Sequence, residues 1–285
     1  MPTFYNQATL SYRGGATNSN IVSGEVIGTL RAAKTAVTDT YGRDSVVTYI
    51  VSIVNTGATA YTGLTLTDDL GRYTLDEAEV VPLTYVPGSL HYYVNGDITT
   101  TLPEITSQSP LTLTGITVPA GGSAALVYSA EINGYAPLEA GSVITNTAVI
   151  SGGQLAESIE ASETITVNTG SLLTITKSIY PNVVSENGRV TYTFVIRNSG
   201  NEAADASADL VVTDNFVPVL KNITVTYNGA AWTEGTNYEY SETTGIFRTL
   251  AGQITVPAAT YTRAADNSLI VEPGTAVITV SGNIS

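Results

Sequence analysis

The chain has 285 residues, of which 43% are hydrophobic, and its 11 basic and 25 acidic residues give a formal net charge of −14 at pH 7. It contains no cysteine and a single histidine, which excludes disulfides, thiolate metal sites and cysteine nucleophiles and leaves little for histidine-dependent catalysis. The acidic balance and the lack of a cluster of basic residues also argue against nucleic acid as a partner. We therefore expect no enzyme activity on a substrate, no cofactor and no metal.

Composition also predicts the fold class. Only 13% of the residues are charged, while threonine, valine, alanine and tyrosine are abundant, which favours strands over helical bundles. No stretch approaches the roughly 18 apolar residues that cross a bilayer, and residues 1–25 lack the basic start and apolar run of a secretory signal. We expect an all-β protein with no membrane insertion and no classical signal peptide.

The first predicted strand reads like the end of a domain rather than the beginning of one. Residues 5–15, YNQATLSYRGG, resemble TNTAVISGG at 145–153, where a domain is expected to finish. At a constant offset of 140 residues, the aligned positions are Asn6, Ala8 and Leu10 with Asn146, Ala148 and Ile150.

The following segments occur twice. VTYIVSIVNTG at 47–57 matches VTYTFVIRNSG at 190–200, and at the same offset of 143 residues LRAAK matches LTITK. Hydrophobic residues alternate with period two, and the pattern breaks at turn sequences such as NTG, NSG and PGS, which is typical of antiparallel strands. Further matching pairs are 64–70 with 210–216, and 118–133 with 271–285. Two copies of one unit predict two tandem immunoglobulin-like Greek-key β-sandwiches.

One stretch of the first copy does not follow this pattern. Residues 75–82, LDEAEVVP, fit either a helical turn or a polar loop, and the acidic run from Asp68 to Glu79 lacks the spacing of a calcium-binding loop. We interpret the run as solvated, and His91 as a residue on a strand surface.

The second copy lacks its closing strands. The first copy, at 30–168, continues into VITNTAVISGG and ESIEASETITVNT, whereas the second, at 169–285, ends after AVITVSGNIS. Because unpaired strand edges invite a further strand, residues 1–29 are interpreted as a donor-strand segment for the second sandwich of a neighbouring subunit. Pairing within the chain and a disordered leader remain alternatives. The donor positions are Asn6, Ala8, Leu10 and Tyr12.

The order LxxxK, VTYxxxxxNxG, TDxL, TVPAGGS and TNTAxxSG resembles the tandem repeat domain of unknown function eleven of bacterial surface proteins. The resemblance covers 30–167 nearly completely and 173–285 partly. Size, repeat type and the missing signal also make the chain similar to the major subunits of ribbon-like appendages on clostridial endospores. The resemblance implies a structural fibre subunit whose partner is itself, on a spore or cell surface, assembled in the mother cell where the fibre is a spore appendage.

Some immunoglobulin-like bacterial surface domains form a Lys–Asn isopeptide bond between a first and a last strand, with an acid on a strand between them. This resemblance implies two residue sets. In the first copy the set is Lys34, Asp68 and Asn146, and in the second it is Lys177, Asp214 and Asn6 of the next subunit. Burial would make the amine neutral and keep the acid protonated so that it polarises the Asn carbonyl. Lysine on an edge strand and aspartate in a turn are the ordinary alternatives.

A second function remains open on the sequence alone. The chain could be a monomeric adhesin or carbohydrate-binding module with an unknown surface ligand, in which case some of its 17 tyrosines would line a binding face. Most of these tyrosines fall at alternating strand positions, which favours the core or a half-buried surface instead.

Overall fold

The computed structural model describes residues 3–13, 15–25, 28–75 and 77–284. These residues confirm the all-β prediction, since they form strands and a single 3-10 turn, η1 (Ala206–Ala208). The described residues contain no helix with the length and hydrophobicity needed to cross a bilayer. The chain divides into two compact units, described separately below. Unit 1 is Met1–Ala136 with Val143–Thr166, and unit 2 is Pro137–Ser142 with Val167–Ser285.

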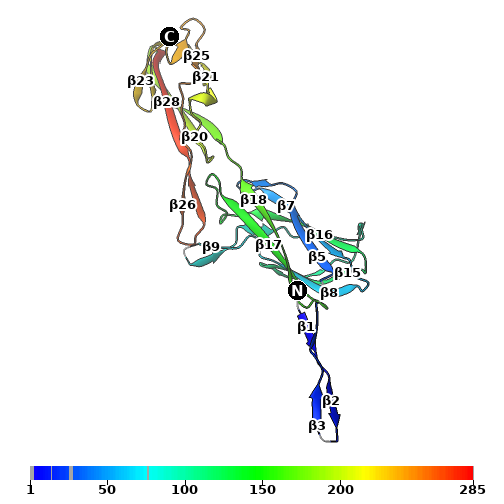
Figure 1. The fold of residues 1–285 in the computed structure, drawn as a ribbon. Helices are drawn as coiled ribbons and strands as arrows, with labels where there is room; N and C mark the ends of the chain where they lie inside the picture. Colours follow the sequence, from blue (N-terminus) through cyan, green and yellow to red (C-terminus); the bar gives the residue numbers. More distant parts are fainter. Residues whose placement is uncertain (1–2, 14, 26–27, 76, 285) are drawn as a thin grey trace. The chain divides into compact units, whose positions relative to one another are not determined.

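Unit 1 contains an N-terminal hairpin and two six-stranded sheets (Figure 1). The hairpin is formed by β1 (Thr3–Asn6), β2 (Thr9–Tyr12), β3 (Gly15–Asn18) and β4 (Val22–Glu25). The sheet strands are β5 (Leu30–Ala36), β6 (Thr40–Tyr41), β7 (Val46–Asn55), β8 (Tyr61–Asp68), β11 (Leu83–Tyr85), β12 (His91–Val94), β13 (Asp97–Ile98), β14 (Glu104–Gln108), β15 (Leu111–Val118), β16 (Ser123–Ile132), β17 (Val143–Gly152) and β18 (Ile159–Val167).

The two large sheets of unit 1 face each other across a core. One has the order β13-β12-β16-β7-β5, with β11 also paired to β16, and the other has the order β14-β15-β8-β17-β18-β6. Alternation along β7 buries Val47, Tyr49, Val51 and Ile53, as the period-two pattern predicts. The Tyr92 hydroxyl of the first sheet donates to the Thr117 carbonyl of the second, which joins the layers.

Unit 2 resembles unit 1 in its first sheet but has a smaller second sheet. Its strands are β19 (Leu173–Tyr180), β20 (Arg189–Asn198), β21 (Thr213–Asn215), β22 (Leu220–Tyr227), β23 (Ala230–Trp232), β24 (Tyr238–Tyr240), β25 (Ile246–Thr249), β26 (Thr260–Arg263), β27 (Leu269–Glu272) and β28 (Gly274–Ile284). The main sheet has the order β19-β20-β28-β22-β23, and the second has only β21-β25-β24. In unit 1, β8 pairs with β15 on one side and with β17 on the other. Its counterpart β21 pairs with β25 alone among the described strands, so one edge is open.

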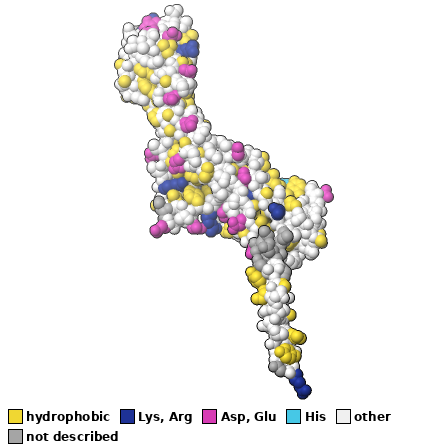
Figure 2. Space-filling view, viewed as in Figure 1, with side chains coloured by type: hydrophobic (Ala, Val, Ile, Leu, Met, Phe, Trp, Pro, Cys, Tyr) yellow, Lys and Arg dark blue, Asp and Glu magenta, His cyan; other side chains and the backbone are white. Residues whose placement is uncertain are grey.

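The N-terminal hairpin pairs only with itself among the described residues. β1 lies antiparallel to β4 and β2 to β3, and neither pair joins a larger sheet. Its side chains between residues 5 and 23 are exposed to solvent wherever they are described. Figure 2 shows hydrophobic side chains in yellow along this hairpin. The large exposed apolar residues are Tyr5, Leu10, Tyr12, Ile21 and Val22.

Two details of the sequence interpretation are wrong. Between 73 and 80 the chain forms neither a helical turn nor a polar loop but a short hairpin of β9 (Tyr73–Leu75) and β10 (Ala78–Val80). Asp76 of the acidic run lies outside the described residues.

The second error concerns the turn before the last matched strand. Val118 and Pro119 correspond to Val256 and Pro257 rather than to residues near 271. The evidence is the asparagine that ends β7 or β20, because Asn55 donates to the Pro119 carbonyl and Asn198 to the Pro257 carbonyl. The β26–β27 hairpin is an insertion in unit 2 that displaces the sequence match.

Candidate functional site

Three neighbouring strands of unit 1 place Lys34, Asp68 and Asn146 in the core, where all three are buried. Lys34 lies on β5, whose alternation points Leu30 and Lys34 inward. Asp68 ends β8 and pairs with Ala148 of β17, so Asn146 is two residues away on the same face of that sheet. The first strand, an internal strand and a closing strand thus contribute one side chain each.

Lys34 and Asp68 form an ion pair with no exposed side-chain surface, at 2.5 Å between Nζ and Oδ2. The Tyr128 hydroxyl donates to the same Oδ2, and the Leu70 N–H donates to Oδ1 at 2.9 Å. Burial lowers the pKa of Lys34, and the attraction of Asp68 opposes this shift only in part. The site therefore eases the conversion of the ammonium to a neutral, nucleophilic amine.

Of the two polar atoms of the Asn146 side chain, only Oδ1 has a hydrogen-bond partner in the described part of the chain. Its Oδ1 accepts a hydrogen bond from the Gly71 N–H at 3.2 Å, whereas Nδ2 is buried without a partner among the described residues. The buried Tyr49 hydroxyl also lacks one, and the Tyr49 ring centroid lies 4.8 Å from Lys34 Nζ. Burial and the nearby Asp68 raise the pKa of Tyr49, which keeps its hydroxyl protonated. Orphaned buried polar atoms each cost about 1–3 kcal/mol and are rare in native cores.

The turn after β8 holds β17 in place. Asp69 Oδ1 accepts from the N–H groups of Gly71 and Thr147, and the Asp69 N–H donates to the Thr147 carbonyl. Leu70 and Gly71 both have a left-handed backbone, with φ of 57° and 71°. A side chain at 71 would bring its Cβ within 2.5 Å of Ile144 Cγ2, so only glycine fits. Sequence reasoning missed Leu70, Gly71, Tyr49 and Tyr128, and the LG that follows TDD is the one local signal for this turn.

Unit 2 holds a related but open site. Lys177 of β19 forms an ion pair with Asp214 of β21, and their side chains are 39% and 19% exposed, against 0% for both members of the pair in unit 1. Lys177 Nζ lies 4.5, 5.5 and 5.3 Å from the ring centroids of Tyr192, Phe194 and Phe216. Lys177 therefore makes cation–π contacts in addition to its ion pair.

The two sites also differ in their partners. Tyr49 pairs with Tyr128 across β7 and β16, whereas its counterpart Tyr192 pairs with Val280 across β20 and β28. The second site therefore has no hydroxyl where Tyr128 stands in the first. Within the described part of unit 2, no strand follows β28 to supply an asparagine.

The structure brings Lys34, Asp68 and Asn146 together, and Lys177 with Asp214. Asn6, the sixth residue of the predicted sets, lies on β1 and pairs with Val22 of β4. The remaining predicted donor residues, Ala8, Leu10 and Tyr12, lie on the exposed N-terminal hairpin.

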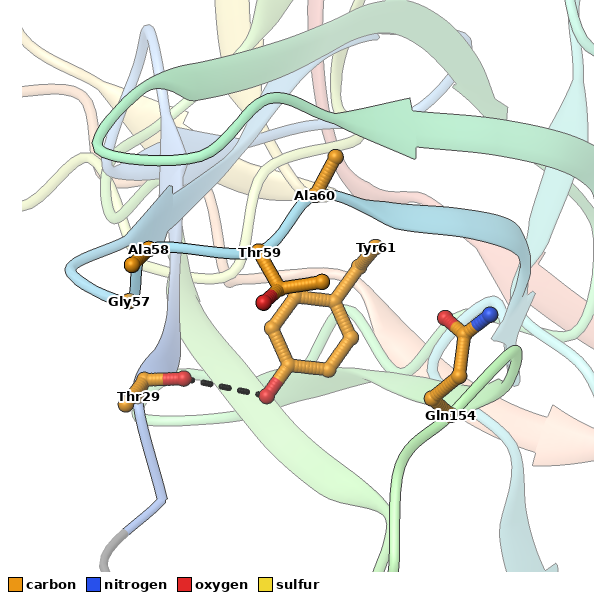
Figure 3. Close-up of a pocket in the computed structure, with 7 residues that line it drawn as sticks. All are labelled: Thr29, Gly57, Ala58, Thr59, Ala60, Tyr61 and Gln154. Atoms are coloured by element: carbon orange, nitrogen blue, oxygen red, sulfur yellow. Dashed lines mark hydrogen bonds between the residues drawn. The ribbon is translucent and has the colours of Figure 1, made fainter.

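Other candidates carry little chemistry. His91 is exposed on β12, and the described residues include no cluster of three or more His, Cys, Asp or Glu suited to a metal ion. A cavity of about 260 Å³ is lined by uncharged residues. Two of them, Tyr61 and Thr29, form a hydrogen bond between their hydroxyl groups at 3.0 Å, which Figure 3 draws as a dashed line. The other lining residues are Gly57, Ala58, Thr59, Ala60 and Gln154.

No family model matches the chain, and no curated protein matches it. Among solved structures, the major pilin subunit of Bacillus cereus is 12% identical, with 98% of this chain and 74% of that one covered at a TM-score of 0.37. The pilus backbone of Streptococcus pneumoniae is 13% identical at a TM-score of 0.36, and the match covers 86% of this chain and 55% of that one. The collagen adhesin of S. aureus is 12% identical, with 55% of each chain covered at a TM-score of 0.32. The chain thus spans about half the length of the last two proteins, and identities this low describe a resemblance in fold alone.

Proposed function

We propose that the chain is a structural subunit of a self-assembling extracellular fibre, either pilus-like or a spore appendage. Subunits join head to tail when residues 1–29 of one subunit enter unit 2 of the next as donor strands. The contact is heterologous, so its repetition extends a filament. The exposed inner face of β19 carries this proposal.

β19 presents apolar side chains to solvent on the face that its counterpart β5 buries. Ile175 and Ile179 are 53% and 40% exposed, although they pair with Ile196 and Tyr192 on the core side of the sheet. In unit 1 the closing strands β17 and β18 complete the facing sheet. An apolar strip beside the open edge of β21 fits a hairpin that would bring both strand pairing and cover.

The N-terminal hairpin has the form that this gap needs. It pairs Asn6 with Val22 just as β17 and β18 pair Asn146 with Glu163, and its apolar side chains lie in solvent. An isolated two-stranded hairpin with exposed apolar residues is marginal in water, so docking against a larger sheet would stabilise it.

The proposal also includes two isopeptide bonds. Lys34 and Asn146 would form an isopeptide bond inside unit 1, and Lys177 would form one with Asn6 of the docked neighbour. Docking would bury Lys177 and Asp214, which already form the ion pair seen at the first site. Because the side chains of Lys177 and Asp214 are partly exposed before docking, the second bond would form only after assembly has buried them.

The test compares the full chain with a chain lacking residues 1–29, by light scattering and electron microscopy of the same samples. Fibres from the full chain and small particles from the truncated chain are expected, and adding a peptide of residues 1–29 should give a one-to-one complex with the truncated chain. Monomers in both samples would overturn the proposal and favour a monomeric adhesin or carbohydrate-binding module. Fibres in both would remove the donor role from residues 1–29.

A further inference from the structure

We propose that the Leu70–Gly71 turn is an oxyanion site, in which the Gly71 N–H stabilises the negative charge that develops on Asn146 Oδ1 when Lys34 attacks. The inference rests on the proposed isopeptide bond of unit 1. It assigns the polarising role to a backbone amide and leaves Asp68 to accept a proton, in contrast to the expectation that a protonated acid polarises the carbonyl.

The hydrogen bonds support this division of roles. Asn146 Oδ1 accepts from Gly71 N–H, and none of the bonds made by Asp68 reaches Asn146. Both Asp68 oxygens are occupied, Oδ1 by the Leu70 N–H and Oδ2 by Lys34 and Tyr128. These contacts place Asp68 to take a proton from Lys34, and none of them places it to donate to Asn146 Oδ1.

The backbone of this turn has two features that are typical of anion-binding sites, namely successive N–H donors and left-handed φ values. Successive N–H groups of Leu70 and Gly71 donate to the two functional side chains, and both residues have left-handed φ values. Consecutive amides aimed at one side form concavities that bind negative charge. A left-handed leucine costs free energy, and such strain gathers at functional sites. Asp69 fixes the direction of the Gly71 N–H through its own hydrogen bond at 2.8 Å.

The reaction balances with the groups present. The Lys34 ammonium gives one proton to the Asp68 carboxylate, and the neutral amine attacks Asn146 Cγ to form the new C–N bond. The negative charge that forms on Asn146 Oδ1 is stabilised by the hydrogen bond from the Gly71 N–H. The Cγ–Nδ2 bond then breaks as Asp68 returns its proton to Nδ2, while the surplus proton on Lys34 Nζ passes to Asp68. Ammonia leaves and takes this proton, which restores the carboxylate.

Unit 2 lacks this device before docking. The residues in the places of Leu70 and Gly71 are Phe216 and Val217, and neither has a left-handed φ. The Phe216 N–H donates to the Gly245 carbonyl instead of to a carboxylate. A bond at the joint would therefore form without a preformed oxyanion donor and more slowly than the bond inside unit 1.

The test removes one N–H from the full chain. Glycolic acid in place of Gly71, introduced during cell-free translation, turns this amide into an ester that cannot donate. The matched control has glycolic acid in place of Gly57, whose N–H donates to Asn55 Oδ1 at 2.9 Å in another turn of unit 1. Samples quenched at intervals are digested, and the fraction of Lys34 peptide linked to Asn146 peptide is measured by mass spectrometry.

The Gly71 ester should slow linkage about a hundredfold, in line with loss of one oxyanion donor, while the Gly57 ester keeps the wild-type rate. Equal rates in the Gly71 ester and the wild type would overturn the inference but not the proposed bond, whereas no linkage in the wild type would overturn the bond itself. A crystal structure of the wild-type chain provides an independent measurement should the ester not fold. The Gly71 N–H is expected to contact Asn146 Oδ1 there, and an Asp68 oxygen in its place would contradict the assignment.

Discussion

Tyr128 donates its hydroxyl to Asp68 at the oxygen that also accepts the Lys34 ammonium, so the only carboxylate in the core of unit 1 among the described residues is shared by a phenol and an amine. The hydroxyl is fully buried with this bond as its partner, and its pKa is raised by burial and by Asp68. Removing it changes both the stability of the core and the balance of the proton between Lys34 and Asp68.

Tyr128→Phe should destabilise unit 1 by about 1.5–3 kcal/mol, the usual value of a hydrogen bond to a charged group. The single tryptophan, Trp232, lies in unit 2, so its fluorescence reports on the wrong unit. Amide hydrogen exchange of β7 and β16 measures the effect directly. Tyr93→Phe, on β12, is the control and should leave exchange unchanged, while equal protection in both variants would show that the Tyr128 bond contributes nothing.

Asn146→Ala should leave the chain heavier than the wild type by the mass expected for one unlost ammonia, after correction for the substitution. It should also destabilise unit 1 by about 4–5 kcal/mol, because a cross-link that closes a loop of roughly a hundred residues restricts the unfolded chain by that amount. Intact mass and hydrogen exchange of unit 1 check the two effects. A wild-type mass equal to the sum of its residues would contradict the bond.

The rate of linkage inside unit 1 should rise with pH and reach its plateau below 10.5, since burial lowers the pKa of Lys34 and the neutral amine is the nucleophile. The same lowered pKa also makes the stability of the unlinked Asn146→Ala chain depend on pH. The folded state binds fewer protons than the unfolded state between the lowered pKa and 10.5, so the free energy of unfolding should rise with pH across this window. Linkage that begins only above pH 10 would contradict the shift.

Asn6→Ala should abolish covalent joints while fibres still form, because strand pairing and apolar cover do not need the amide. Samples boiled in detergent should run as monomers for Asn6→Ala and as a ladder for the wild type. Gln7→Ala is the control, since it removes a side-chain amide next to Asn6, just beyond the end of β1. The Nε2 of this amide donates to the Ser19 carbonyl at 2.8 Å. Identical ladders in all three samples would exclude Asn6 as the linked residue.

Ile175→Glu should block assembly without unfolding the subunit, since this side chain is already half exposed in the free protein. A charge on the inner face of β19 would have to be buried when the hairpin docks, which costs several kcal/mol. Thr176→Glu places the same charge on the opposite face of β19 and should assemble like the wild type. Light scattering compares the two, and fibres from Ile175→Glu would place the docking surface elsewhere.

Much of this organisation follows from the repeat in the sequence. The matching segments were enough to align Lys34 with Lys177 and Asp68 with Asp214, because each residue lies in a strand sequence that occurs in both copies. The stretch between the two residues is 34 positions in the first copy and 37 in the second, so the loop between the matched strands differs in length. The β26–β27 insertion could not be predicted in this way. It separates TVPA at 255–258 from β28, whereas in the first copy TVPA at 117–120 stands directly before β16. Tyr128 was one alternating tyrosine among many. The role proposed for Gly71 depends on a backbone angle and on a hydrogen bond across strands, which no local pattern encodes.

Lys34 and Asn146 also define how unit 1 would respond to mechanical load. In the proposed fibre under tension, force would enter this unit through β5 and leave through β17 and β18. A bond between the two side chains would carry that force from the first strand to the closing strands. The chain from β6 to β16 would then bear no tension, and pulling could extend only the residues outside the linked loop, before Lys34 and after Asn146.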